Sequence, residues 1–176
     1  MMVTYESLVL AFPDDDVTVA SLVDLPVAVT DPTARRVLTE VGLPEHVEQS
    51  LWFEELDTPL VTVASSGSGP SAAAVARAGD FYVIGVSTAG LLCLDGASGE
   101  CYFVDGDGNV LLAATRLDLL LEFVWRLKTG IDAGHLGEGW AQSLVGELRE
   151  LDPVTFAASE GKWREVVAAC HAIALS

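Results

Sequence analysis

Short apolar segments alternate with turn-forming residues in the middle of the chain. The segments span residues 80–87, 90–95, 100–105 and 109–114, and the links between them are Ser87–Ala89, GASG and GDG. Such runs, bounded by glycine, serine and aspartate, are typical of strands and their turns. Because a parallel crossover needs about a dozen residues or more, the short links predict an antiparallel meander.

Helical spacing of apolar residues appears on both sides of this meander. The predicted helices are 3–12, a helix from Asp31-Pro32 to Gly42, one from Thr115 to Gly130 with a capping-box-like Thr115–Asp118, one over 138–151, and one from Ser159 to 174. Strands in the middle with helices at both ends predict a single α+β domain over 1–176, in which about four to six strands form a mostly antiparallel central sheet.

Three remaining segments have weaker patterns. The β-branched content of residues 17–23 indicates a strand, and residues 48–64 indicate either two short strands or a strand and a loop. Residues 65–71, SSGSGPS, are expected to form a flexible surface loop, because their glycines match no phosphate-binding spacing.

The charge is strongly negative and unevenly distributed. The chain has 26 acidic and 9 basic residues, a net charge of −17. Up to Thr115 we count 17 acids against Arg35, Arg36 and Arg77, a net of −14, and the remaining nine acids and six bases give −3. Such a field repels nucleic acid and anionic membranes and attracts basic partners. Solubility alone is the simpler interpretation.

Two motifs resemble catalytic or metal sites but lack a required residue. Gly85-Val86-Ser87-Thr88-Ala89 is one residue short of a nucleophile elbow, and a strand rather than a helix is predicted to follow it. Asp105, Asp107 and Asn109 match the start of a calcium loop, but valine and arginine stand where the loop needs glycine and glutamate. We therefore expect Ser87 in a turn, and a hairpin rather than a calcium site.

The cysteines indicate neither a disulfide framework nor a metal site. There are three, widely spaced, with no Cys-x-x-Cys and no zinc-type cluster with histidine. Cys93 and Cys101 lie on opposite arms of the predicted GASG hairpin and could face each other. We predict reduced, buried thiols, a cytoplasmic protein, and no cofactor.

Exposed carboxylates and one tryptophan are the best candidates for partner contacts. Trp125, Trp140 and Trp163 lie on helical apolar stripes and are expected in the core, whereas Trp52 adjoins an acidic run, as an interface residue would. Glu54 and Glu55 could do acid–base chemistry only if they were buried together. The predicted partner-binding residues are Asp14, Asp15, Asp16, Trp52, Glu54, Glu55, Asp57, Asp95, Asp105 and Asp107.

Residues 35–128 resemble the SUKH superfamily, in particular its fourth subgroup of bacterial immunity proteins. The matching pieces are RRVLTEVGLPE (35–45), GDFYVIGVSTAGLLCLDGASGECYFVD (79–105) and TRLDLLLEFVWRL (115–127). Residues 129–176 then form a helical extension of this core. The turn Ser87–Ala89 is less polar than is usual in the family.

The resemblance implies an antiparallel sheet between helices and a non-catalytic protein that binds a toxin domain, often a nuclease or nucleic-acid deaminase. It agrees with the negative charge, since such toxins are basic where they hold phosphate. We expect a basic protein partner, with no direct binding of nucleic acid or membrane. The alternatives are a scaffold or regulatory adaptor with a non-toxin partner, and a hydrolase using Ser87.

Overall fold

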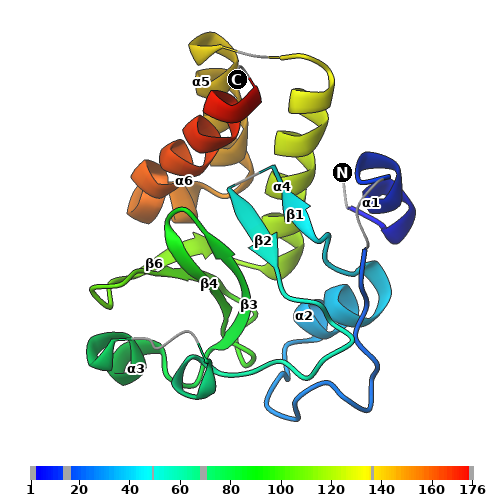
Figure 1. Cartoon of the computed structure of the whole chain (residues 1–176), viewed down its shortest axis with the longest axis vertical. Helices are drawn as coiled ribbons and strands as arrows, with labels where there is room; N and C mark the ends of the chain where they lie inside the picture. The colour runs from blue at the N-terminus through cyan, green and yellow to red at the C-terminus, as the bar shows by residue number, and fades with distance from the viewer. Residues whose placement is uncertain (1–2, 14–16, 49, 68–70, 136, 175–176) are drawn as a thin grey trace.

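A six-stranded antiparallel sheet forms the centre of the molecule, with helices before and after it in the chain (Figure 1). The computed structural model describes residues 3–13, 17–48, 50–67, 71–135 and 137–174. The strands are β1 (His46–Val47), β2 (Leu51–Phe53), β3 (Tyr82–Ser87), β4 (Gly90–Leu94), β5 (Cys101–Val104) and β6 (Val110–Ala114). The helices are α1 (Tyr5–Ala11), α2 (Pro32–Arg36), the π-helix η1 (Val37–Val41), the 3₁₀-helix η2 (Val63–Ser65), α3 (Ala72–Ala78), α4 (Leu117–Asp132), α5 (Glu138–Leu151) and α6 (Pro153–Ala174).

The strands follow one another in the sheet in chain order, and each is antiparallel to the next. Strands β3 to β6 are the four segments predicted from the sequence, with ends that differ by at most two residues. Residues 48–64 contain β2, a loop and η2, so the alternative of a strand and a loop is confirmed. The α+β class and the antiparallel meander are therefore confirmed.

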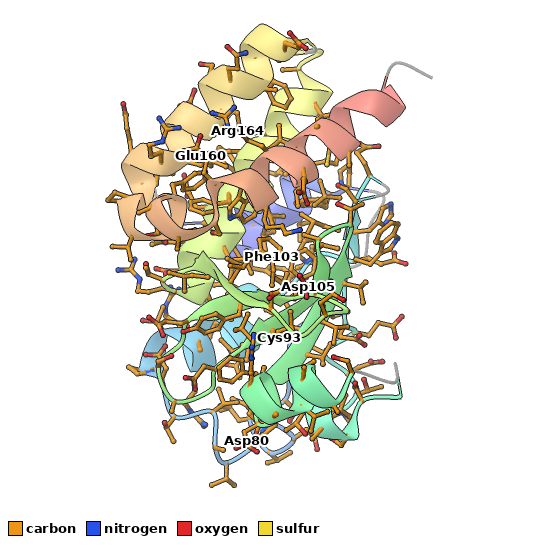
Figure 2. The ribbon with its side chains drawn as sticks, turned by 90° about the vertical axis from the view of Figure 1, so that its left-hand side faces the viewer. Asp80, Cys93, Phe103, Asp105, Glu160 and Arg164 are labelled. Atoms are coloured by element: carbon orange, nitrogen blue, oxygen red, sulfur yellow. The ribbon has the colours of Figure 1, made fainter. Side chains whose placement is uncertain are left out.

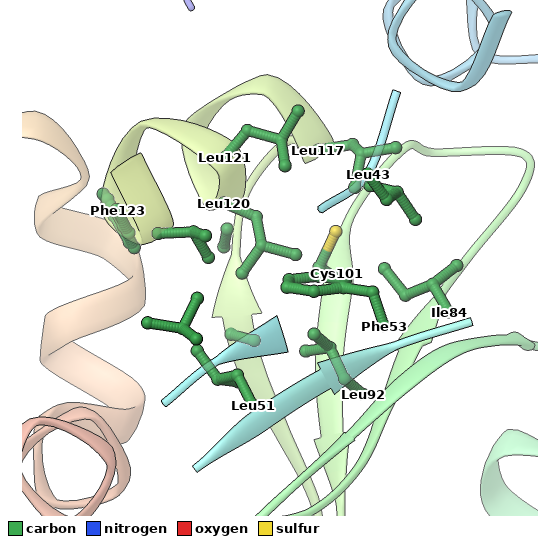
Figure 3. Close-up of a cluster of buried hydrophobic side chains, with 14 of the residues drawn as sticks. Leu43, Leu51, Phe53, Ile84, Leu92, Cys101, Leu117, Leu120, Leu121 and Phe123 are labelled. Atoms are coloured by element: carbon green, nitrogen blue, oxygen red, sulfur yellow. The ribbon is translucent and has the colours of Figure 1, made fainter. Parts of the chain in front are cut away.

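One face of the sheet, called here the inner face, packs on the long helices. Leu51 and Phe53 of β2 and Leu92 of β4 point toward Leu120 and Leu121 of α4 (Figure 3). All of these side chains are at most 7 % exposed and belong to one apolar cluster that extends from α1 to α6. Because strand residues alternate between faces, Trp52 is left on the opposite, outer face.

The outer face is covered in part by the short helix α3, which the sequence analysis did not predict. Ser71 caps α3 by accepting a hydrogen bond from the Ala74 N–H at 3.2 Å. Ala74 and Ala78 pack with Val83 and Cys93 of the sheet in a second, smaller apolar cluster. Of the predicted loop 65–71, Ser65 ends η2, Ser71 caps α3, and residues 68–70 lie outside the described residues.

The prediction of a strand over residues 17–23 is wrong. Only Thr18 makes a bridge, to Leu43, and the Ala20 N–H donates to the Leu38 carbonyl in η1. The segment therefore hydrogen-bonds to the end of a helix rather than to a sheet edge, and Val23 is 87 % exposed. The helix predicted from Asp31 is confirmed, and the Asp31 carboxylate accepts from the Ala34 N–H at 2.7 Å.

The C-terminal helices follow the predicted order with different junctions. Helix α5 has the predicted bounds, and α4 continues past the expected end at Gly130 to Asp132. The capping box at Thr115 is wrong, because the N-cap of α4 is Arg116 and the Thr115 hydroxyl instead donates to Asp152. Helix α6 begins at Pro153 rather than at Ser159, where the backbone is non-helical (φ −142°, ψ 22°) and the hydroxyl donates to the Leu112 carbonyl of β6.

Candidate partner-binding surface

The balance of positive and negative side chains differs between the chain up to Thr115 and the chain after it. The C-terminal helices hold ion pairs, among them Arg149–Glu160 at 2.7 Å and Arg164–Glu160 at 2.6 Å. Figure 2 shows Glu160 and Arg164 at one end of the molecule and Asp80 at the other. The sheet and the N-terminal segments have few cations, so most of their carboxylates cannot have a matching positive partner.

Two of the three arginines before Thr115 bind backbone oxygens. Arg35 Nη1 donates to the Val29 carbonyl at 2.9 Å, and Arg77 Nη1 donates to the Gly108 carbonyl at 3.1 Å. These contacts hold a loop before α2 and the turn after β5. The 17 carboxylates of this part of the chain exceed its three arginines by 14, so the field around it is negative.

Four carboxylates gather around a depression at the edge of the sheet, next to β2. Its volume is about 170 Å³, and we call it the acidic depression; its lining residues are Thr18, Glu45, Phe53, Glu54, Glu55 and Asp57. The loop that follows β2 forms one wall. This loop is anchored by Leu56, which is 2 % exposed and whose N–H donates to the Thr18 hydroxyl at 3.1 Å. Glu54, Glu55 and Asp57 on either side of the anchor remain exposed.

Glu45 is the functional candidate that the sequence analysis missed. It precedes β1 and is exposed, and its carbonyl accepts a hydrogen bond from the Phe53 N–H at 2.8 Å. This pairing sets Glu45 opposite Phe53, so Glu45 and Glu54 both line the acidic depression although they are nine positions apart in the chain. Only the strand register could have revealed the proximity.

Trp52 lies on the outer face beside the acidic depression. Its side chain is 44 % exposed, and it stands directly opposite Val86 of β3. Glu54 is two positions further along the chain, and its N–H donates to the Ile84 carbonyl at 3.0 Å, so the extended pairing continues and Glu54 shares the outer face with Trp52. Both predicted contact residues are thus brought together.

The aspartates at the sheet turns stabilise the turns themselves. Asp95 accepts from the Ala97 N–H at 2.9 Å, and Asp105 accepts from the backbone and side chain of Asn109, both at 2.9 Å. The hydrogen bonds from Asn109 lower the pKa of Asp105 below its ordinary value. Asp95 precedes β5 whereas Asp105 and the exposed Asp107 follow it, so the two turns lie at opposite ends of the sheet. Asp14, Asp15 and Asp16 lie outside the described residues.

The environment of Ser87 fits a turn rather than a nucleophile. Its hydroxyl donates to the Gly90 carbonyl at 3.1 Å and accepts from the Ala89 N–H at 3.0 Å, and the residue is 7 % exposed. These bonds close the tight link between β3 and β4. The strand that follows Ser87, as predicted, replaces the helix that a nucleophile elbow needs.

The cysteines are free, buried and separated. Cys93 pairs with Tyr102, and Cys101 pairs with Leu94, so the two thiols point to opposite faces of the sheet rather than toward each other. Burial raises the pKa of Cys93 to about 12 and the pKa of Cys170 to about 11. Within the ranges that the structure describes, no group of three or more histidine, cysteine, aspartate or glutamate side chains is placed to hold a metal ion.

The model of the SUKH-4 immunity protein family matches residues 3–169. The chain belongs to the SUKH-4 immunity protein family. The match includes α1 and continues through α5 into α6, well beyond the stretch that carries the motifs. Comparisons with curated proteins and with solved structures gave no significant match.

Membership explains the general role of the molecule: immunity proteins of this family act against toxins. None of the described helices of this SUKH-4 protein is both long enough and apolar enough to cross a bilayer. The acidic depression, Trp52 and Glu54 lie on the described surface of this protein at and beside β2.

Proposed function

We propose that this SUKH-4 protein neutralises a cognate polymorphic toxin by binding it, without catalysing a reaction. The toxin is a nuclease or a nucleic-acid deaminase, and the binding surface of the immunity protein is acidic. The observation that carries this proposal is the imbalance before Thr115, where 17 carboxylates stand against three arginines. Two of these arginines, Arg35 and Arg77, bind backbone oxygens.

Charge affects both the rate of association and the choice of partner. A toxin that acts on nucleic acid presents a basic surface to the phosphates, and an acidic protein can occupy that surface in their place. Complementary charge raises association rates by about 10- to 1,000-fold over the uncharged case. The same field repels nucleic acid and anionic membrane, so neither is expected as a direct partner.

The acidic depression supplies a place for a lysine or arginine of the toxin. Glu45, Glu54, Glu55 and Asp57 approach it from two segments of the chain, and Leu56 fixes one of these segments to Thr18. Held apart by the backbone, these carboxylates repel one another, and a single cation between them relieves the repulsion. We expect charge-assisted hydrogen bonds there in the complex.

The proposal extends to location and organisation. A toxin that attacks nucleic acid must be met in the cytoplasm, and the three free cysteines are consistent with a reducing compartment. The apolar cluster that contains residues from α1, the sheet and α6 supports the interpretation of 1–176 as one domain, with 129–176 as its helical extension.

The test is binding and protection with the toxin domain encoded beside the gene. We expect copurification, rescue of growth, and an association rate that falls at least about tenfold between about 50 mM and about 500 mM salt. Glu54→Gln with Glu55→Gln should slow association, whereas Glu150→Gln, on the exposed side of α5, should not. Absence of a complex at micromolar concentration and low salt, without growth rescue, would contradict the proposal.

Two other functions make different predictions. A scaffold or regulatory adaptor would bind a non-toxin partner, and the neighbouring genes would then encode no toxin. A hydrolase using Ser87 would show activity in an esterase screen that is lost in Ser87→Ala. The bonds of the Ser87 hydroxyl to Gly90 and Ala89 favour its role in the turn.

A further inference from the structure

The outer face of the sheet is covered over only part of its width. Helix α3 and η2 lie over β3 to β6, where Val63, Ala74, Val83 and Cys93 are all at most 2 % exposed. Strand β2 is not part of this covered cluster. The boundary of the cover therefore runs across the sheet near β3.

One cross-strand row passes from the covered part to the bare part. Trp52 pairs with Val86, Val86 with Leu91, and Leu91 with Val104, so all four side chains share the outer face. Val104 is 2 % exposed, Leu91 is half-buried, Val86 is 39 % exposed and Trp52 is 44 % exposed. Apolar side chains thus continue in register beyond the edge of the cover.

Folding does not require apolar residues at the bare end of this row. An antiparallel strand with one solvated face normally carries polar residues there, as alternation with a buried face allows. In β2 the inner-face neighbours Leu51 and Phe53 are buried, and a polar residue between them would satisfy the pattern equally well. Contiguous exposed apolar side chains, rimmed by charge, are typical of interaction sites.

We propose that Trp52, Val86 and Leu91, with Glu54 on the rim, form the surface on which the toxin docks. We call this set the bare patch; its assignment rests on the proposed function. The occupant is a protruding part of the toxin with an apolar or planar side chain that packs on Trp52. A lysine or arginine beside that side chain reaches Glu54 and the acidic depression.

Charge decides between this occupant and a second copy of the chain. Self-association through the bare patch would bring two molecules of net charge −17 together and place the acidic depression of one close to that of the other. Like charges across an interface suppress such pairing, whereas a basic protein gains from the same carboxylates. An exposed tryptophan in an apolar row, next to carboxylates, also matches the composition of interface hot spots.

The experiment uses the full chain and the toxin domain encoded beside its gene, carrying an inactivating substitution. Trp52→Ala should raise the Kd for the toxin at least about 30-fold, and Val86→Asp should raise it at least about tenfold. Trp52→Phe keeps a planar ring and should stay within about fivefold of the unsubstituted protein. Melting temperatures of all variants show whether each one is folded.

The matched control is Val27→Asp, which adds the same charge at an exposed apolar side chain. Val27 is 92 % exposed and adjoins Ala28, whose carbonyl packs against Gly96 in the β4–β5 turn, away from the Trp52 end of β3. We expect Val27→Asp to bind the toxin with unchanged Kd. Toxin-induced protection from hydrogen exchange should cover β2 and the end of β3.

The outcomes separate this inference from the proposed function. If the unsubstituted protein does not bind the toxin, the proposed function fails. If it binds, but folded Trp52→Ala and Val86→Asp bind equally well, only the docking surface is overturned. A dimer in sedimentation that Trp52→Ala converts to monomer, with toxin affinity unaffected, would assign the bare patch to a second copy and overturn the inference as well.

Discussion

Replacement of Asp152 by alanine should destabilise the protein more than most surface or helix substitutions. The side chain is 2 % exposed and sits where α5 ends and α6 begins. Its Oδ2 accepts from the Thr115 N–H at 2.7 Å, the Thr115 hydroxyl at 2.9 Å and the Thr155 hydroxyl at 2.8 Å. Its Oδ1 accepts from the Thr155 N–H at 3.2 Å, which caps α6. One carboxylate therefore joins two helix junctions.

The magnitude follows from the donors that the substitution leaves without an acceptor. A buried donor that loses its partner costs about 1–3 kcal/mol, and the loss of a helix N-cap costs about 1 kcal/mol. The two threonine hydroxyls can rotate toward other acceptors, but the two backbone N–H groups cannot. We therefore expect Asp152→Ala to lower the free energy of unfolding by about 2–4 kcal/mol, a large share of the roughly 5–15 kcal/mol typical of a domain.

Asp152→Asn is the informative companion variant. The N–H groups of Thr115 and Thr155 bond to different carboxylate oxygens, so either orientation of the amide sets one N–H against an NH₂ group. Loss of one bond predicts a cost of about 1–2 kcal/mol, intermediate between the unsubstituted protein and Asp152→Ala. The exposed Glu150→Ala, two positions away, should change stability by less than about 0.5 kcal/mol.

The assay is equilibrium unfolding in urea, followed by far-UV circular dichroism. With a typical slope of about 2 kcal/mol per molar, Asp152→Ala should lower the midpoint by about 1–2 M. A change of less than about 1 kcal/mol for Asp152→Ala, or an identical cost for the alanine and asparagine variants, would refute the reasoning about the shared acceptor.

Three further predictions concern a turn, the buried thiols and strand β3. Folding lowers the pKa of Asp105, so the charged carboxylate stabilises the protein above pH 3.8, and this contribution is lost as the pH falls through the pKa of the folded state. The difference in stability between the unsubstituted protein and Asp105→Asn should therefore shrink between about pH 6 and about pH 2.5. A difference that stays constant over this range would contradict the prediction. Because burial raises the pKa of Cys93 and Cys170, native protein should react slowly with a thiol reagent at about pH 8 and react at all three cysteines once unfolded, and fast native labelling would count against the burial. Gly85→Ala would place a Cβ 2.4 Å from the Trp52 carbonyl oxygen, so we expect a loss of about 2 kcal/mol in urea unfolding, and an unchanged midpoint would show that β2 can shift freely.

The sheet was predictable because its turns are short and local. The GASG and GDG links restrict their flanking strands to antiparallel neighbours, and the Asp95 and Asp105 side chains accept hydrogen bonds from residues of their own turns. Helix α5 was predictable for the same reason, because its apolar stripe and the Asp152-Pro153 pair that ends it lie within or directly after the helix.

The errors arose where distant contacts override local preference. Residues 17–23 have the composition of a strand, but Thr18 meets a helix end at Leu43 rather than a free sheet edge. The break in α6 at Ser159 depends on Leu112 of β6, which is 47 positions away. Helix α3 is a short alanine-rich segment held by Ser71 and by its packing on the sheet, and its pattern alone predicts little.

In the candidate site, too, the residues set by local sequence were predictable and those set by strand register were not. The acidic run that adjoins Trp52 was enough to single out Trp52 and Glu54 as candidates from the sequence. Glu45 and Val86 were not predictable, because their places beside these residues come from the β1–β2 and β2–β3 registers.

The most direct test of the account measures the affinity between this SUKH-4 protein and the toxin domain encoded beside its gene, by calorimetry at two salt concentrations. The account predicts a tight one-to-one complex whose affinity falls as salt rises, together with rescue of growth in cells that express the toxin. A protein that rescues growth by chemically altering the toxin or its product, with no stable complex formed, would contradict it.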